Sequence, residues 1–131
     1  MKRIYNTGLD TNQITLGVTV GTVGIAYTSV YLSRSGGQQL KIAESNEDSG
    51  NIKEKSIGTA SSLRSSYLII LTSIDLTNVD KDLWQNQADN LSIRYHLSGG
   101  FSGSQIYNQD IDDTKVLPNG KILVTKPVEL L

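Results

Sequence analysis

The chain has 131 residues, 12 basic and 13 acidic side chains, and no cysteine. This length predicts a single domain, residues 1–131, which buries about two thirds of its unfolded surface and needs no disulfide or metal to fold. The balanced, scattered charge argues against nucleic acid as a partner, because binding a phosphate backbone requires a clustered basic surface. The lack of cysteine excludes disulfides, thiolate nucleophiles and zinc–thiolate sites.

Apolar runs are short throughout the sequence. The longest, Tyr67 to Leu71, is far too short to span a bilayer, and no apolar signal-peptide region follows the basic start Met1-Lys2-Arg3. We therefore expect a soluble chain with no signal peptide and no membrane insertion. Both the cytoplasm and a virion or other extracellular assembly suit such a chain.

The first half of the chain repeats with a period of two, which is typical of β-strands. From Ile14 to Val20, apolar residues alternate with threonine and glycine only, so this strand has one buried face and one bare face. Residues 25–34 carry apolar side chains on both faces, which predicts a strand covered on two sides. Weaker strands are expected at 39–43 and 52–57, on either side of the polar loop 44–51.

The second half continues the same pattern with one interruption. Residues 67–76 are the strongest candidate for a central strand, and 91–97 alternates cleanly. Residues 80–88 are the one segment with helical character. A polar strand is expected at 105–108, and Pro118-Asn119-Gly120 predicts the turn of a C-terminal hairpin.

About eight or nine short strands with at most one short helix predict an all-β fold, an antiparallel β-sandwich of jelly-roll-like type. The ends have little core pattern. We expect an extended N-terminal arm over residues 1–12 and an extended C-terminal tail over residues 126–131, where Pro127 interrupts the chain. Arms of this kind can add a strand to a neighbour's sheet.

No set of residues in the sequence predicts catalysis. A catalytic triad needs a histidine that reaches both a nucleophile and a carboxylate, and the single histidine, His96, lies in mid-strand on a polar face. We therefore interpret it as a solvated strand residue. The glycine-rich segment 99–104 lacks the lysine and helix of a phosphate-binding loop. We predict no catalytic residues, no metal site, no cofactor and no enzymatic activity.

A weak binding site is predicted where the loops of one end meet. Phe101 is flanked by glycines and has no obvious packing partner, so it is the best candidate for an interaction anchor. Tyr107 adds a second aromatic ring. The acidic cluster Asp110, Asp112 and Asp113 supplies oxygen ligands that calcium prefers but departs from the EF-hand spacing, so solvated turn residues are the better explanation. The candidate binding residues are Phe101, Tyr107, Asp110, Asp112 and Asp113.

The favoured hypothesis is a non-enzymatic structural or interaction module. It would self-associate as a homo-oligomer, or decorate a larger assembly such as a virion or surface appendage, with other assembly proteins as partners. The alternative is a sandwich that binds a carbohydrate or another small ligand, with calcium assisting, so that a glycan is the second candidate partner. A third hypothesis is a small hydrolase that uses acidic residues such as Asp112.

Overall fold

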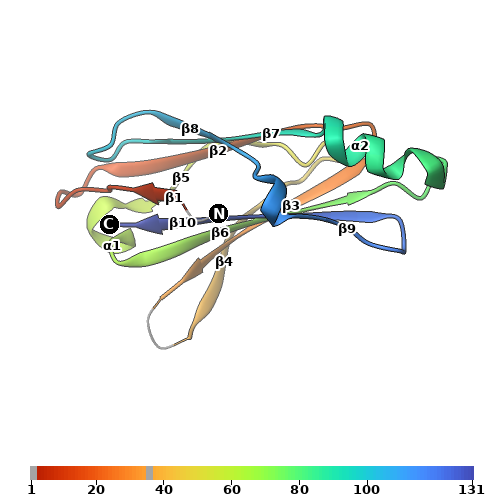
Figure 1. Cartoon of the computed structure of the whole chain (residues 1–131). Coiled ribbons are helices and arrows are strands. Elements are labelled where there is room, and N and C mark those ends of the chain that lie inside the picture. The colour runs from red at the N-terminus through yellow and green to blue at the C-terminus, as the bar shows by residue number, and fades with distance from the viewer. Residues whose placement is uncertain (1–2, 35–36) are drawn as a thin grey trace.

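The computed structural model describes residues 3–34 and 37–131 and folds them into two stacked β-sheets (Figure 1). The strands are β1 (Arg3–Tyr5), β2 (Gln13–Gly21), β3 (Ile25–Ser33), β4 (Gln39–Glu44), β5 (Ile52–Thr59), β6 (Ser66–Asp75), β7 (Ser92–Ser98), β8 (Gln105–Asn108), β9 (Thr114–Val116) and β10 (Lys121–Leu130). The six-stranded sheet has the order β1-β10-β6-β3-β4, with β9 also paired to β10. The four-stranded sheet has the order β5-β2-β7-β8. The all-β sandwich predicted from the sequence is confirmed.

Helical structure is short. The described helices are α1 (Ala60–Leu63), η1 (Lys81–Leu83), α2 (Trp84–Asn90) and η2 (Ile111–Asp113). The predicted helical segment corresponds to η1 and α2, which lie together at one end of the sandwich (Figure 1). The single turn α1 begins with a capping box in which Thr59 and Ser62 each bond the other's backbone N–H. Across the described ranges, no helix is long and apolar enough to cross a membrane.

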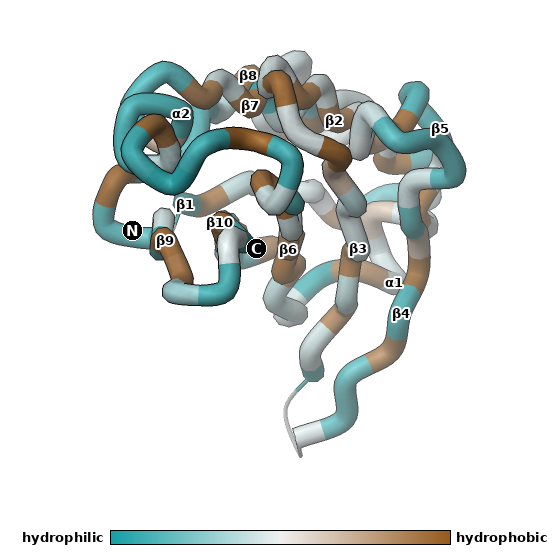
Figure 2. Tube along the Cα trace, turned by 90° about the vertical axis from the view of Figure 1, so that its right-hand side faces the viewer, coloured by the Kyte–Doolittle hydropathy of each residue, from teal (hydrophilic) through white to brown (hydrophobic). Residues whose placement is uncertain are grey.

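The core lies between the two sheets, and the period of two explains its composition. Every second residue of β2, β6 and β7 points inward, so Ile14, Leu68, Ile70 and Ile93 are completely buried. Figure 2 shows the two layers from the end, with hydrophobic segments in both. Trp84 packs against the margin of this core, where its indole N–H donates to the carbonyl oxygens of two loop residues.

The two ends of the chain lie side by side in the six-stranded sheet. β1 runs parallel to β10, with Arg3 opposite Val128, whereas the strand pairs β10–β6 and β3–β6 are antiparallel. Leu131 donates its N–H to the carbonyl of Tyr5 at 3.0 Å, which fixes the C-terminus. The tail expected over 126–131 therefore continues β10, and the described part of the expected arm begins with β1. Pro127 continues the strand opposite Ile69 of β6, and the described pairing of β10 with β1 begins at the next residue.

Among the residues that the structure describes, one buried side-chain polar atom has no hydrogen-bond partner. The Tyr95 hydroxyl, on β7, is completely buried and makes no hydrogen bond within the described residues. Burial raises the pKa of this hydroxyl, and the nearby carboxylates of Asp110 and Asp113 add to the effect. We expect Tyr95→Phe to raise the free energy of unfolding by about 1 kcal/mol, because it removes an unsatisfied donor and keeps the ring. Urea denaturation measures this change.

Tyr107→Phe is the matched control for that substitution. The Tyr107 hydroxyl donates to the carbonyl of Ile4 at 3.2 Å, so its removal should leave stability unchanged or lower it. A loss of stability in Tyr95→Phe would contradict the assignment of an unsatisfied hydroxyl.

Candidate functional site

Phe101 lies on the surface at one end of the sandwich, as expected for an anchor residue. Its side chain is 82% exposed, and that of Leu9 is 75% exposed. Together with Asn6, Gly8 and Asp10 they line an open depression of about 550 Å³. The structure thus places one aromatic and one aliphatic side chain together in contact with solvent.

Asp110 has a structural partner. Its carboxylate accepts hydrogen bonds from Lys126 Nζ at 2.6 Å and from the Arg3 guanidinium at 3.1 Å. Lys126 points into the sandwich from β10, its side chain is completely buried, and Nζ also donates to the carbonyl of Asn108 at 2.6 Å. The bond from the Lys126 ammonium is the main reason that the pKa of Asp110 lies below its usual range. Asp110 therefore compensates a buried charge.

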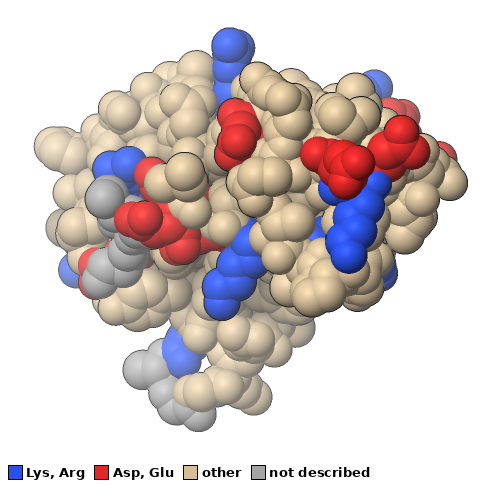
Figure 3. All heavy atoms as spheres, turned by 45° about the vertical axis from the view of Figure 1, so that its right-hand side comes forward, with Lys and Arg blue, Asp and Glu red and all other residues tan. Residues whose placement is uncertain are grey.

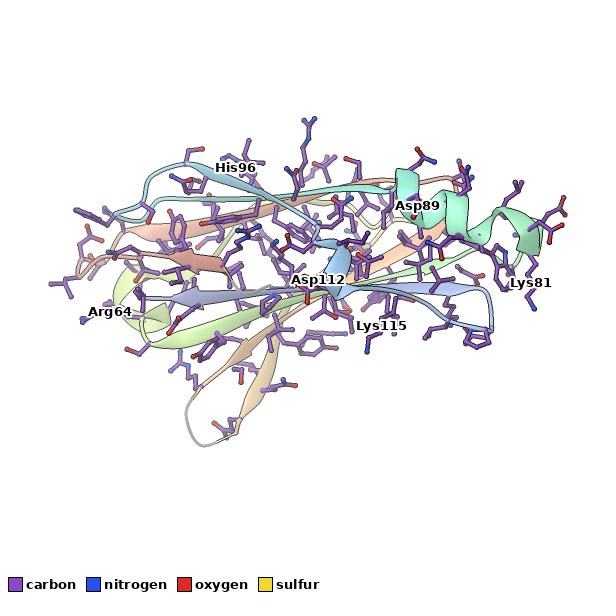
Figure 4. The ribbon with its side chains drawn as sticks, in the orientation of Figure 1. Arg64, Lys81, Asp89, His96, Asp112 and Lys115 are labelled. Atoms are coloured by element: carbon purple, nitrogen blue, oxygen red, sulfur yellow. The ribbon has the colours of Figure 1, made fainter. Side chains whose placement is uncertain are left out.

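The other predicted residues are not gathered with Phe101. Tyr107 and Asp110 line a different depression from the one beside Phe101. Asp112 lies exposed on η2, where the chain passes from β8 towards the six-stranded sheet (Figure 4). Asp113 is in the same turn and donates its backbone N–H to the Asp110 carbonyl. Within the part of the chain that the structure describes, no group of three or more His, Asp or Glu side chains could hold a metal ion.

The outer side of the six-stranded sheet carries a cluster of apolar side chains, interrupted by Ser29, Ser73 and Thr125, which we call the apolar face. Strand register places Tyr31, Ile69 and Pro127 in one row across β3, β6 and β10. The apolar face consists of Ile25, Tyr27, Tyr31, Tyr67, Ile69, Leu71, Leu123 and Pro127. All of these side chains are half-buried or exposed, because no described element packs over them (Figure 1). The prediction that β3 is covered on both sides thus holds in the single chain only for its inner side.

Charged side chains surround the apolar face. Lys121 and Asp75 lie beside Ile25 in the row at one end, and Glu129 lies beside Tyr67 in the row at the other end. At the edge formed by β4, the Lys41 ammonium bonds the Glu44 carboxylate at 2.8 Å and lowers its pKa. In Figure 3, which shows part of the surface, basic and acidic side chains are interspersed. The apolar face therefore has a polar rim, as protein interfaces commonly do.

The outer side of the four-stranded sheet is polar and contains a chain of three side chains that the sequence did not predict. Glu54 on β5 bonds Nδ1 of His96 on β7, and Nε2 of His96 lies 2.6 Å from the Ser104 hydroxyl. We call this arrangement the Glu54–His96–Ser104 relay; Figure 4 labels His96 within the upper layer. His96 lies on the polar outer side of its sheet, as expected, with its side chain 30% exposed, and both of its ring nitrogens are also hydrogen-bonded. Comparisons of the chain with protein-family models, with curated proteins and with solved structures found no match.

Proposed function

We propose that the protein is a self-associating interaction module that binds a second copy of itself through the apolar face. The observation that carries this proposal is the cluster of eight apolar side chains on the outer side of the six-stranded sheet, none of which is fully buried. Monomeric proteins rarely expose continuous apolar patches larger than a few hundred Å². A second copy would cover this surface and turn the outer side of β3, β6 and β10 into a second core.

The size of the face suits a weak, reversible dimer. Strands lie about 4.8 Å apart and rise about 3.3 Å per residue, so the three strands that carry the apolar face, β10, β6 and β3, present a surface about 14 Å wide and 30 Å long. The resulting area is roughly 430 Å² per copy, or about 860 Å² for two, in the range of weak and transient interfaces, and the polar rim on β4 would add to it.

The charges along β10 make the face complementary to itself. Outward-pointing residues run from Lys121 at one end to Glu129 at the other, with Leu123, Thr125 and Pro127 between them. A two-fold axis across the strands at Thr125 would place Lys121 opposite Glu129 of the second copy. The same axis places Leu123 opposite Pro127, so apolar residues meet apolar residues.

The neighbouring strands obey the same symmetry. Leu71 is the register partner of Thr125 and would meet its own copy, while the row of Tyr31 would face the row of Tyr27. Strands of the two copies would then run nearly antiparallel, which suits the aligned packing of twisted sheets at about 30°. Lys121 and Glu129 would select this orientation, and the aromatic rings would supply most of the buried area.

Light scattering after size exclusion, over a range of protein concentrations, tests the proposal. We expect the wild-type chain to approach the mass of a dimer and Ile69→Lys to remain a monomer, because the substitution puts a charge at the centre of the face. Ile106→Lys is the matched control: Ile106 is 61% exposed on β8, in the other sheet, and its replacement should not affect the dimer. A monomeric wild type at the highest concentration, or equal dissociation by both variants, would overturn the proposal.

The orientation has its own test. Lys121→Glu and Glu129→Lys should each weaken the dimer by placing like charges opposite one another, whereas the double variant should recover much of the lost affinity. If the double variant does not recover the lost affinity, the two-fold symmetry that pairs Lys121 with Glu129 is excluded. The apolar face would then remain the proposed interface, in another orientation.

A further inference from the structure

The Glu54–His96–Ser104 relay depends on a glycine in the strand between its members. The sheet order β5-β2-β7 means that Glu54 must cross β2 to reach His96. The residue at the crossing is Gly17, the register partner of His96. A Cβ atom on Gly17 would lie 2.8 Å from Cγ of Glu54, so any side chain there would displace the carboxylate. Because Gly17 has no side chain, the Glu54 side chain can lie across β2 and contact the imidazole.

The carboxylate determines which ring nitrogen carries the proton. An ionised carboxylate only accepts hydrogen bonds, so the bond between Glu54 and His96 places the hydrogen on Nδ1. In the neutral ring, Nε2 then has a free lone pair and accepts from the Ser104 hydroxyl at 2.6 Å. A serine bonded to a histidine that a carboxylate orients is the arrangement of acyl-transfer triads.

Ser104 is accessible, and an apolar side chain lies beside its base. Ser104 is exposed and immediately precedes β8, on which Ile106 pairs directly with His96. Paired residues of antiparallel strands point to the same side of a sheet, so Ile106 lies next to the imidazole on the outer face. The Ile106 side chain is 61% exposed and offers an apolar contact for a short acyl chain.

We propose that Ser104 is an activated nucleophile that accepts the acyl group of small carboxylic esters. Its Oγ attacks the carbonyl carbon while its proton passes to Nε2 of His96. The tetrahedral intermediate then breaks the bond to the leaving alcohol, which takes that proton and departs, leaving an acyl ester on Ser104. Water, deprotonated by His96, then attacks the carbonyl carbon of this ester. The carboxylic acid leaves as His96 returns the proton to Oγ of Ser104, so the sum is ester plus water giving acid plus alcohol.

Two probes test the proposal on the full chain: hydrolysis of p-nitrophenyl acetate and covalent labelling by a fluorophosphonate, with the labelled residue identified by peptide mass mapping. We expect a phosphonyl adduct on Ser104, and its absence in Ser104→Ala. His96→Asn should lower the labelling rate about 100-fold, the ordinary contribution of a general base. Glu54→Gln should lower the rate and change its dependence on pH, because Glu54 acts only by positioning His96.

Ser56→Ala is the matched control. Ser56 is an exposed serine of the same sheet whose hydroxyl donates to the Gln13 side chain and not to a member of the relay, so its variant should be labelled like the wild type. Unfolding midpoints of all variants confirm that each is folded. Wild-type protein without an adduct on Ser104, labelling at other residues only, or an unchanged rate in His96→Asn would each overturn the proposal. The relay lies on the four-stranded sheet and the apolar face on the six-stranded sheet, so labelling of Ser104, or its absence, does not test the proposed dimer.

Discussion

Asp110→Ala is expected to lower the free energy of unfolding by about 3–5 kcal/mol, because it leaves a buried charge without its partner. The Lys126 side chain is completely buried, and Asp110 supplies the carboxylate that bonds its ammonium at 2.6 Å. Arg3 also bonds Asp110 but is 42% exposed, so water replaces that contact at little cost. Chemical denaturation of wild type and variant measures the difference.

We expect the ion pair to add little net stability, because Asp110 only offsets the cost of burying the Lys126 charge. Lys126→Met keeps an unbranched side chain in the core and removes the buried charge, so we expect a much smaller loss than for Asp110→Ala. In the Lys126→Met background, Asp110→Ala should cost little. Asp112→Ala, an exposed carboxylate in the same turn, should change stability by no more than about 0.5 kcal/mol. Equal effects of Asp110→Ala and Asp112→Ala would contradict the structural role of Asp110.

Acid should reproduce the effect of removing Asp110. Its pKa is lowered in the folded state, so the folded chain binds the proton less tightly than the unfolded chain does. The resulting stability is fully present above the unfolded pKa, about 3.9, and is lost as the pH falls through the lower folded value. Stability measured from pH 5 downward should fall less steeply in Asp110→Ala than in the wild type.

The strands that the sequence predicts are those whose hydrophobic pattern lies within one continuous segment. The alternation of β2 and β7 and the apolar runs of β3 and β6 each lie within a single segment, so they could be recognised without knowing any partner. β1 has only three residues and forms a strand because it pairs with β10, at the other end of the chain. No pattern within Arg3–Tyr5 predicts that partner.

The sequence predicts the inward position of Lys126 only if the C-terminal strand is extended to include it. Ile122, Val124, Val128 and Leu130 alternate with outward residues, and the same parity places Lys126 inside. The sequence predicts a separate tail over residues 126–131, because Pro127 interrupts the pattern, and so leaves Lys126 outside that strand. Once the strand is continued through Pro127, a buried lysine follows, and with it the need for a carboxylate such as Asp110.

The Glu54–His96–Ser104 relay could not be predicted from spacing. Glu54 and His96 are 42 residues apart and meet only because β5 and β7 flank β2. The one signal in the sequence was the unusually bare outer face of β2, where Gly17 leaves room for a neighbour's side chain. The bare face indicates that a side chain from a neighbouring strand can lie across β2. Which side chain does so depends on the strand order, which the sequence does not reveal.

Gly99→Ala is expected to lower the free energy of unfolding by about 3 kcal/mol or more. Gly99 has φ +96°, and a Cβ atom there would lie 2.0 Å from the carbonyl oxygen of Gln13 at the start of β2. A left-handed backbone costs an alanine about 1–2 kcal/mol, and the backbone overlap adds about 1–3 kcal/mol. Urea denaturation, followed by the fluorescence of Trp84, measures the loss.

Gly103→Ala separates the two contributions to that loss. Gly103 has φ +72° in the same loop, but nothing lies within 4 Å of its Cβ position. Alanine there should therefore cost only the strain of the backbone, about 1–2 kcal/mol. A Gly99 variant no less stable than the Gly103 variant would show that the loop moves away from Gln13. If the loop is held as the structure has it, Gly99 fixes the segment that leads from His96 to Ser104, and the same variant should slow labelling of that serine.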